Sequence, residues 1–223
     1  MNVSEVLTNH LISFMVKQKE AWGIQDTESR FIYTNKVFLK DSCLTTNFNI
    51  EGRYTFECPV SWAEYADIFD NHKKIVIESG KKMVSIATHP VAKEQTLQSF
   101  FVEKSPYYNQ NKIIGTISHG RKIPPVLLSK YFFKNPTIPS LLTNHPPNDL
   151  FTTEELNVLF FAMKLFGDKE IALRLGTYSC VVEQIIRQIC NKIGIHSRKQ
   201  LRDYGIAEGF DNYFPPFLLK GLL

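Results

Sequence analysis

Residues 151–205 read FTTEELNVLFFAMKLFGDKEIALRLGTYSCVVEQIIRQICNKIGIHSRKQLRDYG. Glycines divide this stretch into four short segments, and within each segment apolar residues recur at helical spacing. Thr152 and Glu155 form a capping-box pattern that predicts the start of the first helix. Gly176 and Gly194 end the second and third helices, because glycine accepts the left-handed backbone of a tight turn. The stretch therefore predicts four short helices.

The third predicted helix, from about Ser179 to Ile193, has two different sides. One side is an apolar stripe made of Val182, Ile185, Ile186, Ile189 and Ile193. The opposite side is polar and consists of Gln184, Arg187, Gln188, Asn191 and Lys192. Two short helices joined by a tight glycine turn, the second with an apolar back and a polar face, form a helix-turn-helix.

The same stretch resembles the DNA-binding domain of LuxR/NarL-type transcription regulators over all four helices, without a gap. The resemblance is carried by Asp168-Lys169-Glu170-Ile171-Ala172, Leu175-Gly176, Val182, Ile189, Lys192-Ile193-Gly194-Ile195 and Arg198. It implies double-stranded DNA as a partner of a homodimer, with RNA polymerase as a possible further partner. The implied DNA-binding residues are Lys169, Gln184, Arg187, Gln188, Asn191 and Lys192. Among them, Gln184 and Gln188 are expected at adenine edges and Arg187 at guanine or phosphate.

Four departures from the family pattern leave a second interpretation open. Tyr178, Val181, Glu183 and Ile185 stand where the family usually has Ser, Thr, Lys and His. The stretch also carries eight Lys and Arg against six Asp and Glu, a modest excess for a module that must neutralise phosphates. The alternative is a protein-interaction regulator with a degenerate helix-turn-helix that does not bind DNA by itself.

Residues 20–121 show a different pattern, with five strand-like runs and one long helix. The runs are Ala21–Asp26, Arg30–Asn35, Met83–His89, Leu97–Lys104, which Pro106 is expected to close, and Ile113–His119, and the helix is Ser61–Ser79. This order resembles a PAS domain, as do the segments Ile32–Phe38, Ile77–Gly80, Glu103–Pro106 and Ile114–Ile117. The resemblance implies an antiparallel five-stranded sheet with helices.

PAS domains enclose a small-molecule pocket or mediate dimerisation with nothing bound. The resemblance implies pocket residues Trp22, Tyr33, Phe38, Phe56, Tyr65, Phe69, Phe101 and Thr116. Large apolar side chains also fill cores that bind no ligand, and this alternative stays open. The Asn-Cys-Arg motif of flavin-binding photosensors is absent. Haem-binding PAS domains use a histidine on or near the long helix, where His72 stands, but a lone histidine is more often structural or exposed. Neither a certain cofactor nor a metal is therefore predicted.

The bulk properties fit two cores in a cytoplasmic protein. Hydrophobic residues make up 43% of the 223, and the net charge of +4 permits a nucleic-acid partner without demanding one. The four cysteines lack metal-ligand spacing and read as reduced thiols. No secretory signal is visible in Met1–Lys17, which carries polar residues throughout, and no apolar run is long enough for a membrane span. No catalytic motif is found, so an enzyme is not expected.

The sequence as a whole predicts an α+β chain in which a PAS sensor domain is joined to an all-α four-helix DNA-binding domain. The joining segment has six prolines, which exclude a long helix across it. The apolar C-terminal tail is expected to dock on the chain's own surface or on a partner subunit. The predicted parts are an N-terminal helix (1–19), the PAS-like domain (20–121), a linker (122–150), the helix-turn-helix domain (151–205) and the tail (206–223).

Overall fold

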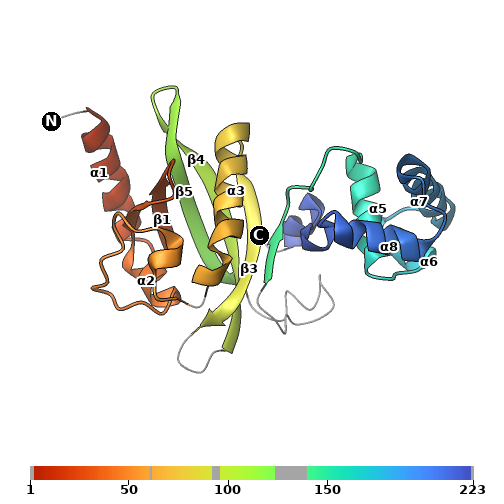
Figure 1. Ribbon diagram of the computed structural model, residues 1–223, viewed down its shortest axis with the longest axis horizontal. Coiled ribbons are helices and arrows are strands. Elements are labelled where there is room, and N and C mark those ends of the chain that lie inside the picture. The colour runs from red at the N-terminus through yellow and green to blue at the C-terminus, as the bar shows by residue number, and fades with distance from the viewer. Residues whose placement is uncertain (1–2, 61, 92–95, 124–139, 222–223) are drawn as a thin grey trace. The chain divides into compact units, whose positions relative to one another are not determined.

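The computed structural model describes residues 3–60, 62–91, 96–123 and 140–221. The chain divides into two compact units, Met1–Leu141 and Leu142–Leu223 (Figure 1). The first unit contains an antiparallel sheet with helices, and the second is built mainly of helices. The predicted α+β class, with a PAS-type sheet followed by a helical unit, is therefore confirmed. Most of the predicted linker, residues 124–139, lies outside the described residues.

The sheet has six strands rather than the predicted five, in the order β2-β1-β5-β4-β3-β6. The additional strand, β6, is a four-residue segment inside the proline-rich stretch, where the composition predicted only a linker. The strands are β1 (Ala21–Asp26), β2 (Phe31–Thr34), β3 (Met83–Val91), β4 (Thr96–Asn109), β5 (Lys112–Ile123) and β6 (Ser140–Thr143).

Strand β4 continues past Pro106, so the prediction that this proline closes the strand was wrong. Pro106 pairs with Thr116 on β5, and the strand runs on to Asn109. Strand β3 begins at Met83, opposite Lys104, and therefore does not reach the level of Pro106. At this position β4 has β3 no longer beside it, which is the edge situation in which a strand tolerates proline.

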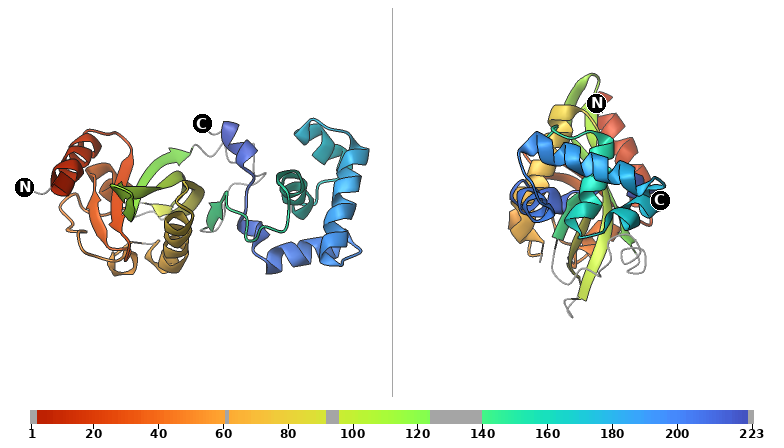
Figure 2. Two further views of the ribbon diagram at one scale, coloured as in Figure 1. Left: turned by 90° about the horizontal axis from the view of Figure 1, so that it is seen from above. Right: turned by 90° about the vertical axis from the view of Figure 1, so that its right-hand side faces the viewer.

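Two longer helices belong to the first unit. Helix α1 spans Val3–Val16, and α3 spans Ala66–Ser79, where it contacts β4 and β5 of the sheet (Figures 1 and 2). The predicted long helix from Ser61 begins later than expected, because a 3-10 turn over Ala63–Tyr65 precedes it. Gly80 ends α3 in the left-handed region, at a φ of 63°.

Asn35 connects three segments of the first unit. It caps α2 (Lys36–Asp41), since its Oδ1 accepts from the backbone N–H of Phe38 at 3.0 Å. The same oxygen accepts from the N–H of Trp22 on β1 at 3.1 Å. Its Nδ2 donates to the carbonyls of Met15 and Glu20, at 3.1 and 2.8 Å. All four hydrogen-bonding positions of this buried amide are therefore used.

The four helices predicted in the second unit are all present. They are α5 (Thr153–Met163), α6 (Asp168–Leu175), α7 (Ser179–Ile193) and α8 (Arg198–Ala207). The capping box is formed, because Glu155 N donates to Thr152 Oγ1 at 3.3 Å and Thr152 N donates to Glu155 Oε2 at 2.8 Å. Helix α5 contacts the other three helices, and α6 contacts α7 (Figure 2).

The C-terminal tail packs on its own unit, as one of the two sequence hypotheses proposed. Phe210 and Phe214 are almost completely buried. The Phe210 ring lies 5.5 Å from that of Phe151, between centroids. The N–H of Phe214 donates to the Thr143 carbonyl at 2.9 Å, which adds a backbone contact to the aromatic packing.

Replacing Asn35 should destabilise the first unit strongly. Asn35→Ala leaves buried backbone groups of several segments without partners, and we expect a loss of about 3 kcal/mol or more in unfolding free energy. Urea unfolding of the full chain measures this loss. Asn49→Ala is the control, since Asn49 is exposed and its side chain accepts one backbone hydrogen bond. Equal, small effects of the two substitutions would contradict the role assigned to Asn35.

Candidate functional site

A cavity of about 120 Å³ lies in the first unit, lined by residues of strands β1–β5 and helices α2 and α3. Five of its twenty lining residues are Phe or Trp, namely Phe31, Phe38, Trp62, Phe69 and Phe100. Nine are polar or charged, namely Gln25, Asp41, Ser42, Thr55, His72, Ser85, His89, Lys104 and Ser118. A hollow that combines aromatic side chains with hydrogen-bonding groups is suited to a small molecule.

Lys104 is the principal charged group of the cavity. Its residue is 8% exposed, and its Nζ makes only a long hydrogen bond, 3.4 Å, to the Phe69 carbonyl among the described residues. Burial, helped by the positive charge of Lys73, lowers the pKa of Lys104 to about 8. The cavity therefore holds an ammonium group that is poorly compensated and would gain from an acceptor on a bound molecule.

Two further groups in the lining can form hydrogen bonds with a ligand. Burial lowers the pKa of His89, so the ring, which stacks on Phe100 with centroids 4.8 Å apart, is neutral near pH 7. The N–H of a neutral ring is used at Nδ1, which donates to the Pro90 carbonyl at 3.3 Å, so Nε2 remains as an acceptor for a ligand. The indole Nε1 of Trp62 is buried and has no hydrogen-bond partner within the described part of the chain. An acceptor atom on a ligand could satisfy this N–H.

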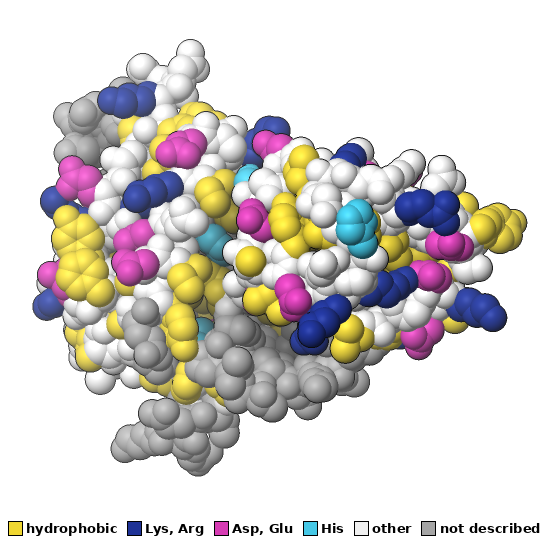
Figure 3. All heavy atoms as spheres, turned by 45° about the vertical axis from the view of Figure 1, so that its right-hand side comes forward, with side chains coloured by type: hydrophobic (Ala, Val, Ile, Leu, Met, Phe, Trp, Pro, Cys, Tyr) yellow, Lys and Arg dark blue, Asp and Glu magenta, His cyan; other side chains and the backbone are white. Residues whose placement is uncertain are grey.

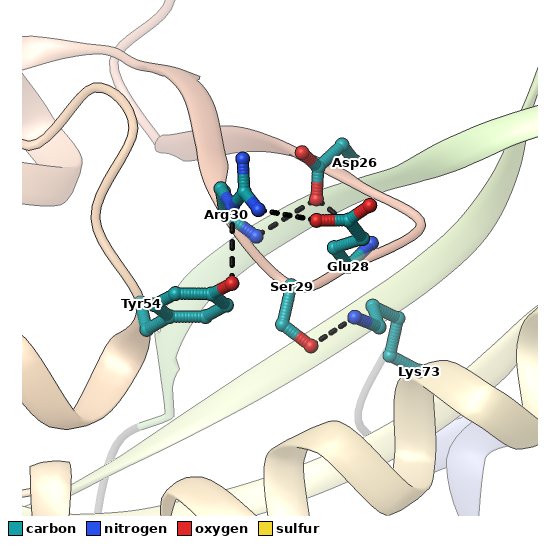
Figure 4. Close-up of polar contacts among 6 residues, drawn as sticks. All are labelled: Asp26, Glu28, Ser29, Arg30, Tyr54 and Lys73. Carbon is teal, nitrogen blue, oxygen red and sulfur yellow. Dashed lines mark hydrogen bonds and ion pairs between the residues drawn. The ribbon is translucent and has the colours of Figure 1, made fainter.

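A second buried lysine holds the hairpin between β1 and β2 against α3. Lys73, which is 2% exposed, donates from its Nζ to Ser29 Oγ (Figure 4). Ser29 has a positive φ of 74° in the turn. The neighbouring Arg30 donates to Tyr54 Oη at 3.0 Å and pairs with Glu28. Desolvation lowers the pKa of Lys73. Lys73 on α3 is therefore, after Lys104 on β4, the second lysine of this unit whose positive charge is disfavoured by burial.

Two of the eight predicted pocket residues, Phe38 and Phe69, line this cavity, and the other six do not. Neighbouring residues of a strand point to opposite faces of the sheet. This alternation explains why Trp22 on β1 and Phe101 on β4 do not line the cavity. Ala21 and Gly23 line the cavity, whereas Trp22 between them stacks on His119. In the same way Phe100 lines it, whereas Phe101 lies under the guanidinium of Arg121.

The remaining four predicted residues lie at other places in the unit. Phe56 is 63% exposed and stacks on Tyr54. Tyr65 packs against the core cluster around Trp62, and Tyr33 is half-buried on β2. Thr116 is fully buried on β5, where it pairs with Gln25 and Pro106. None of these four positions contributes to the lining.

Sequence reasoning missed the polar residues of the cavity, although strand alternation offered a signal. On β3 the residues Met83, Ser85, Ala87 and His89 share one face, and on β4 the residues Phe100, Val102 and Lys104 do so. A serine, a histidine and a lysine on the inward face of otherwise apolar strands are exceptional. They mark the face of the sheet that lines the cavity.

The second candidate site is the outer side of α7. Val182 and Ile189 are fully buried and form the back of the helix. The predicted contact residues on the opposite side, Gln184, Arg187, Gln188, Asn191 and Lys192, are all exposed, as is Lys169 on α6. The residue before the helix, Tyr178, is in the N-cap position but makes no side-chain cap, and Gly194 ends the helix in the left-handed region.

Three cations around this face are paired with carboxylates of the same unit. Arg187 Nη2 lies 2.9 Å from Glu183 Oε1, one turn away on α7. Lys192 Nζ lies 2.7 Å from Glu155 Oε2 on α5. Arg198 pairs with Asp168 and donates to the Phe166 carbonyl. The face shown in Figure 3 accordingly has basic and acidic side chains interspersed rather than in separate patches.

The Lys192–Glu155 pair is the most buried of these contacts. Burial alone would raise the pKa of Glu155, but hydrogen bonds from Lys192 and Thr152 outweigh this and hold its pKa below the usual value. Glu155 is 5% exposed, so its charge depends on these partners. Lys192 thus has a structural contact on the inner side, in addition to its exposed position on α7.

Other kinds of site were searched for in the described residues. They contain no group of three or more His, Cys, Asp and Glu placed to hold a metal ion. No helix among them has the length and apolar character needed to cross a membrane.

The fold of the whole chain is similar to that of solved VqmA structures. A phage VqmA in complex with DPO is 28% identical, with a TM-score of 0.54 over 96% of this chain and 93% of that chain. The Vibrio cholerae VqmA dimer without target DNA, described in connection with DNA binding by LuxR-type receptors, is 26% identical, with a TM-score of 0.51 over 96% and 94%. No protein-family model and no curated protein matches the sequence.

The charge of Lys104 should cost stability when no ligand is bound. A lysine whose pKa falls from 10.5 to about 8 on folding destabilises the folded state by roughly 3 kcal/mol at neutral pH. We therefore expect Lys104→Met to raise the unfolding free energy at pH 7. The wild type should recover as the pH rises from about 8 to 10.5, because the unfolded state binds more protons in that range.

Urea unfolding at pH 7 and at pH 10 measures the effect of Lys104→Met. Lys112→Met, at an exposed position of β5, is the control and should change little at either pH. A Lys104→Met variant less stable than the wild type at pH 7 would contradict an uncompensated charge in the cavity.

Loss of the buried ion pair should destabilise the second unit independently of any DNA. Lys192→Met leaves the Glu155 carboxylate with fewer partners, and we expect a loss of about 1–3 kcal/mol in unfolding free energy at pH 7. Because the folded pKa of Glu155 is depressed, this stabilisation exists above its unfolded value and is lost as the pH falls through the folded value. The difference between variant and wild type should therefore shrink in acid.

Urea unfolding at pH 7 and pH 3 tests the pair. Lys199→Met removes an equivalent charge from an exposed position on α8 and should have little effect. A loss that is the same at both pH values would show that the aliphatic stem of Lys192, not its charge, supports α5.

Proposed function

We propose that this chain is a cytoplasmic, homodimeric transcription regulator of the LuxR type, in which a PAS domain senses a small molecule and a helix-turn-helix binds operator DNA. The observation that carries the proposal is the exposed polar side of α7, backed by a buried apolar side and held by α6 across a glycine turn. The similarity in fold to VqmA over nearly the whole chain supports it.

DNA binding follows from the shape and chemistry of α7. A helix fits the major groove, and its exposed side chains can then reach base edges. The amides of Gln184, Gln188 and Asn191 can donate and accept, and Arg187 can donate to guanine or phosphate. Lys169 on α6 is exposed and is assigned to a phosphate. Two copies of the chain suit two half-sites on the duplex.

Ligand sensing follows from the cavity in the first unit. Its small volume and its mixture of aromatic and polar lining residues suit a small molecule that has both apolar and hydrogen-bonding groups. The Lys104 ammonium and the indole N–H of Trp62 favour a ligand that carries a hydrogen-bond acceptor, and an acidic group would be favoured most. VqmA is described as bound to DPO, and we propose a ligand of comparable role here.

The second candidate function is that of a protein-interaction regulator. The pairing of cations on α7 with carboxylates favours this candidate. Arg187 and Lys192 both lie against carboxylates, so neither is freely available for phosphates in the unbound protein. Exposed pairs such as Arg187–Glu183 are weak, about 0.3–0.5 kcal/mol, and can open when DNA is present. The balance therefore remains with DNA binding.

Binding of the full-length protein to the DNA upstream of its own gene, and to random duplex, tests the proposal. We expect specific binding whose logarithm falls linearly with the logarithm of salt, by about 0.9 for each neutralised phosphate. Arg187→Ala should weaken specific binding by about 1–3 kcal/mol. Arg202→Ala removes the same charge from an exposed position on α8 and should leave binding close to the wild type.

The outcomes separate the two candidates. A folded dimer that binds no duplex at low salt, with or without compounds found to stabilise the first unit, would leave the protein-interaction regulator as the better assignment. Arg187→Ala with wild-type affinity would reject α7 as the contact surface.

A further inference from the structure

We propose that α7 reads A·T base pairs, so that the operator half-sites are rich in A·T where this helix enters the major groove. The inference rests on the proposed function and deepens it, because it names the base sequence that the DNA-binding side recognises. It is argued from the chemistry of the exposed side chains, which are a row of amides and the apolar groups beside it.

Three amide side chains form one row along the exposed side of α7. Gln184, Gln188 and Asn191 are spaced four and three residues apart, which places them on one face, and all three are exposed. A side-chain amide presents a donor and an acceptor together. Adenine presents the complementary pair, the N6 donor and the N7 acceptor, whereas guanine presents two acceptors in the major groove. The row therefore matches adenine better than guanine.

Apolar side chains lie directly beside this row. Val181 is 37% exposed, although the back of the helix is buried, and Ile185 is half-exposed. Val181 stands three residues before Gln184 and Ile185 three residues before Gln188, on the adjoining flank of the helix. An apolar side chain in the major groove recognises the C5-methyl group of thymine. Amides and apolar groups together address both bases of an A·T pair.

Arg187 is the side chain on α7 that could favour guanine instead, because guanine is most commonly read by Arg or Lys, bidentate to O6 and N7. Its pair with Glu183 is exposed on both sides and therefore weak, so it does not hold Arg187 away from DNA. We assign Arg187 to a phosphate, which leaves the base edges to the amide row and its apolar flank. Lys192 lies against Glu155 on α5.

The first experiment selects binding sites from random duplexes with the full-length protein. Footprinting of the selected sites with the wild type and with Gln188→Ala then shows which base pairs lose protection in the variant. We expect A·T pairs to dominate at those positions. Glu208→Ala is the control variant, because Glu208 is exposed at the end of α8, away from this row. It should select the same sites as the wild type.

Two base analogues in the selected site then test direct contact rather than DNA shape. Replacing adenine by 7-deazaadenine removes the N7 acceptor, and we expect binding to weaken roughly 5- to 150-fold. Replacing thymine by deoxyuridine removes a single methyl group, and we expect a loss of about fourfold. The first effect should vanish in Gln188→Ala and the second in Val181→Ala, since each variant already lacks the contact.

Each result has a defined meaning. Selected sites with G·C pairs under α7, or sites insensitive to both analogues, would overturn the A·T assignment while the regulator assignment stands. Failure to select any duplex would remove the regulator assignment and this inference with it. Effects of the analogues that persist unchanged in both variants would place the readout on other residues and also overturn the proposal.

Discussion

The amide of Asn35 fixes the geometry on which the first unit depends. One side chain joins the end of α1, the start of β1 and the first turn of α2, because its oxygen and nitrogen each make two hydrogen bonds to backbone groups. Those backbone groups would otherwise be buried without partners. Residues of β1 and α2 line the cavity, so the position of two of its walls follows from this amide. An aspartate of the same shape could not donate the bonds that hold α1.

The two candidate sites differ in how their positive charges are compensated. Lys73 and Lys104 are both buried, which lowers the pKa of each, and the positive charge of Lys73 lowers the pKa of Lys104 further. In the second unit, by contrast, Arg187, Lys192 and Arg198 are each given a carboxylate. An uncompensated charge in a hollow invites a ligand, whereas a compensated charge on a surface does not attract one from a distance.

Local signals made the second unit predictable, and long-range register limited the first. Thr152, Gly176 and Gly194 set helix ends through bonds to near neighbours, and the structure agrees with each. The fate of Pro106 depends instead on where β3 starts, which no residue near the proline reveals. The cavity lining likewise depends on which alternate residues of β1 and β4 face α3. Strand β6 was not predicted, because its four residues lie in a proline-rich stretch. The pairing of Lys192 with Glu155 spans 37 residues of chain and was invisible in a helical face pattern.

The pairing of cations around α7 has a consequence for how such a regulator would find its target on a chromosome. Attraction to arbitrary DNA is almost wholly electrostatic, and it grows with the number of free positive charges. The three paired cations would contribute less to this attraction than free ones, so the protein would be retained more briefly at wrong sequences. The same pairing of cations would also shorten the distance over which the protein slides along the duplex. Recognition would then proceed by many short encounters, each decided by the fit of neutral side chains to the bases.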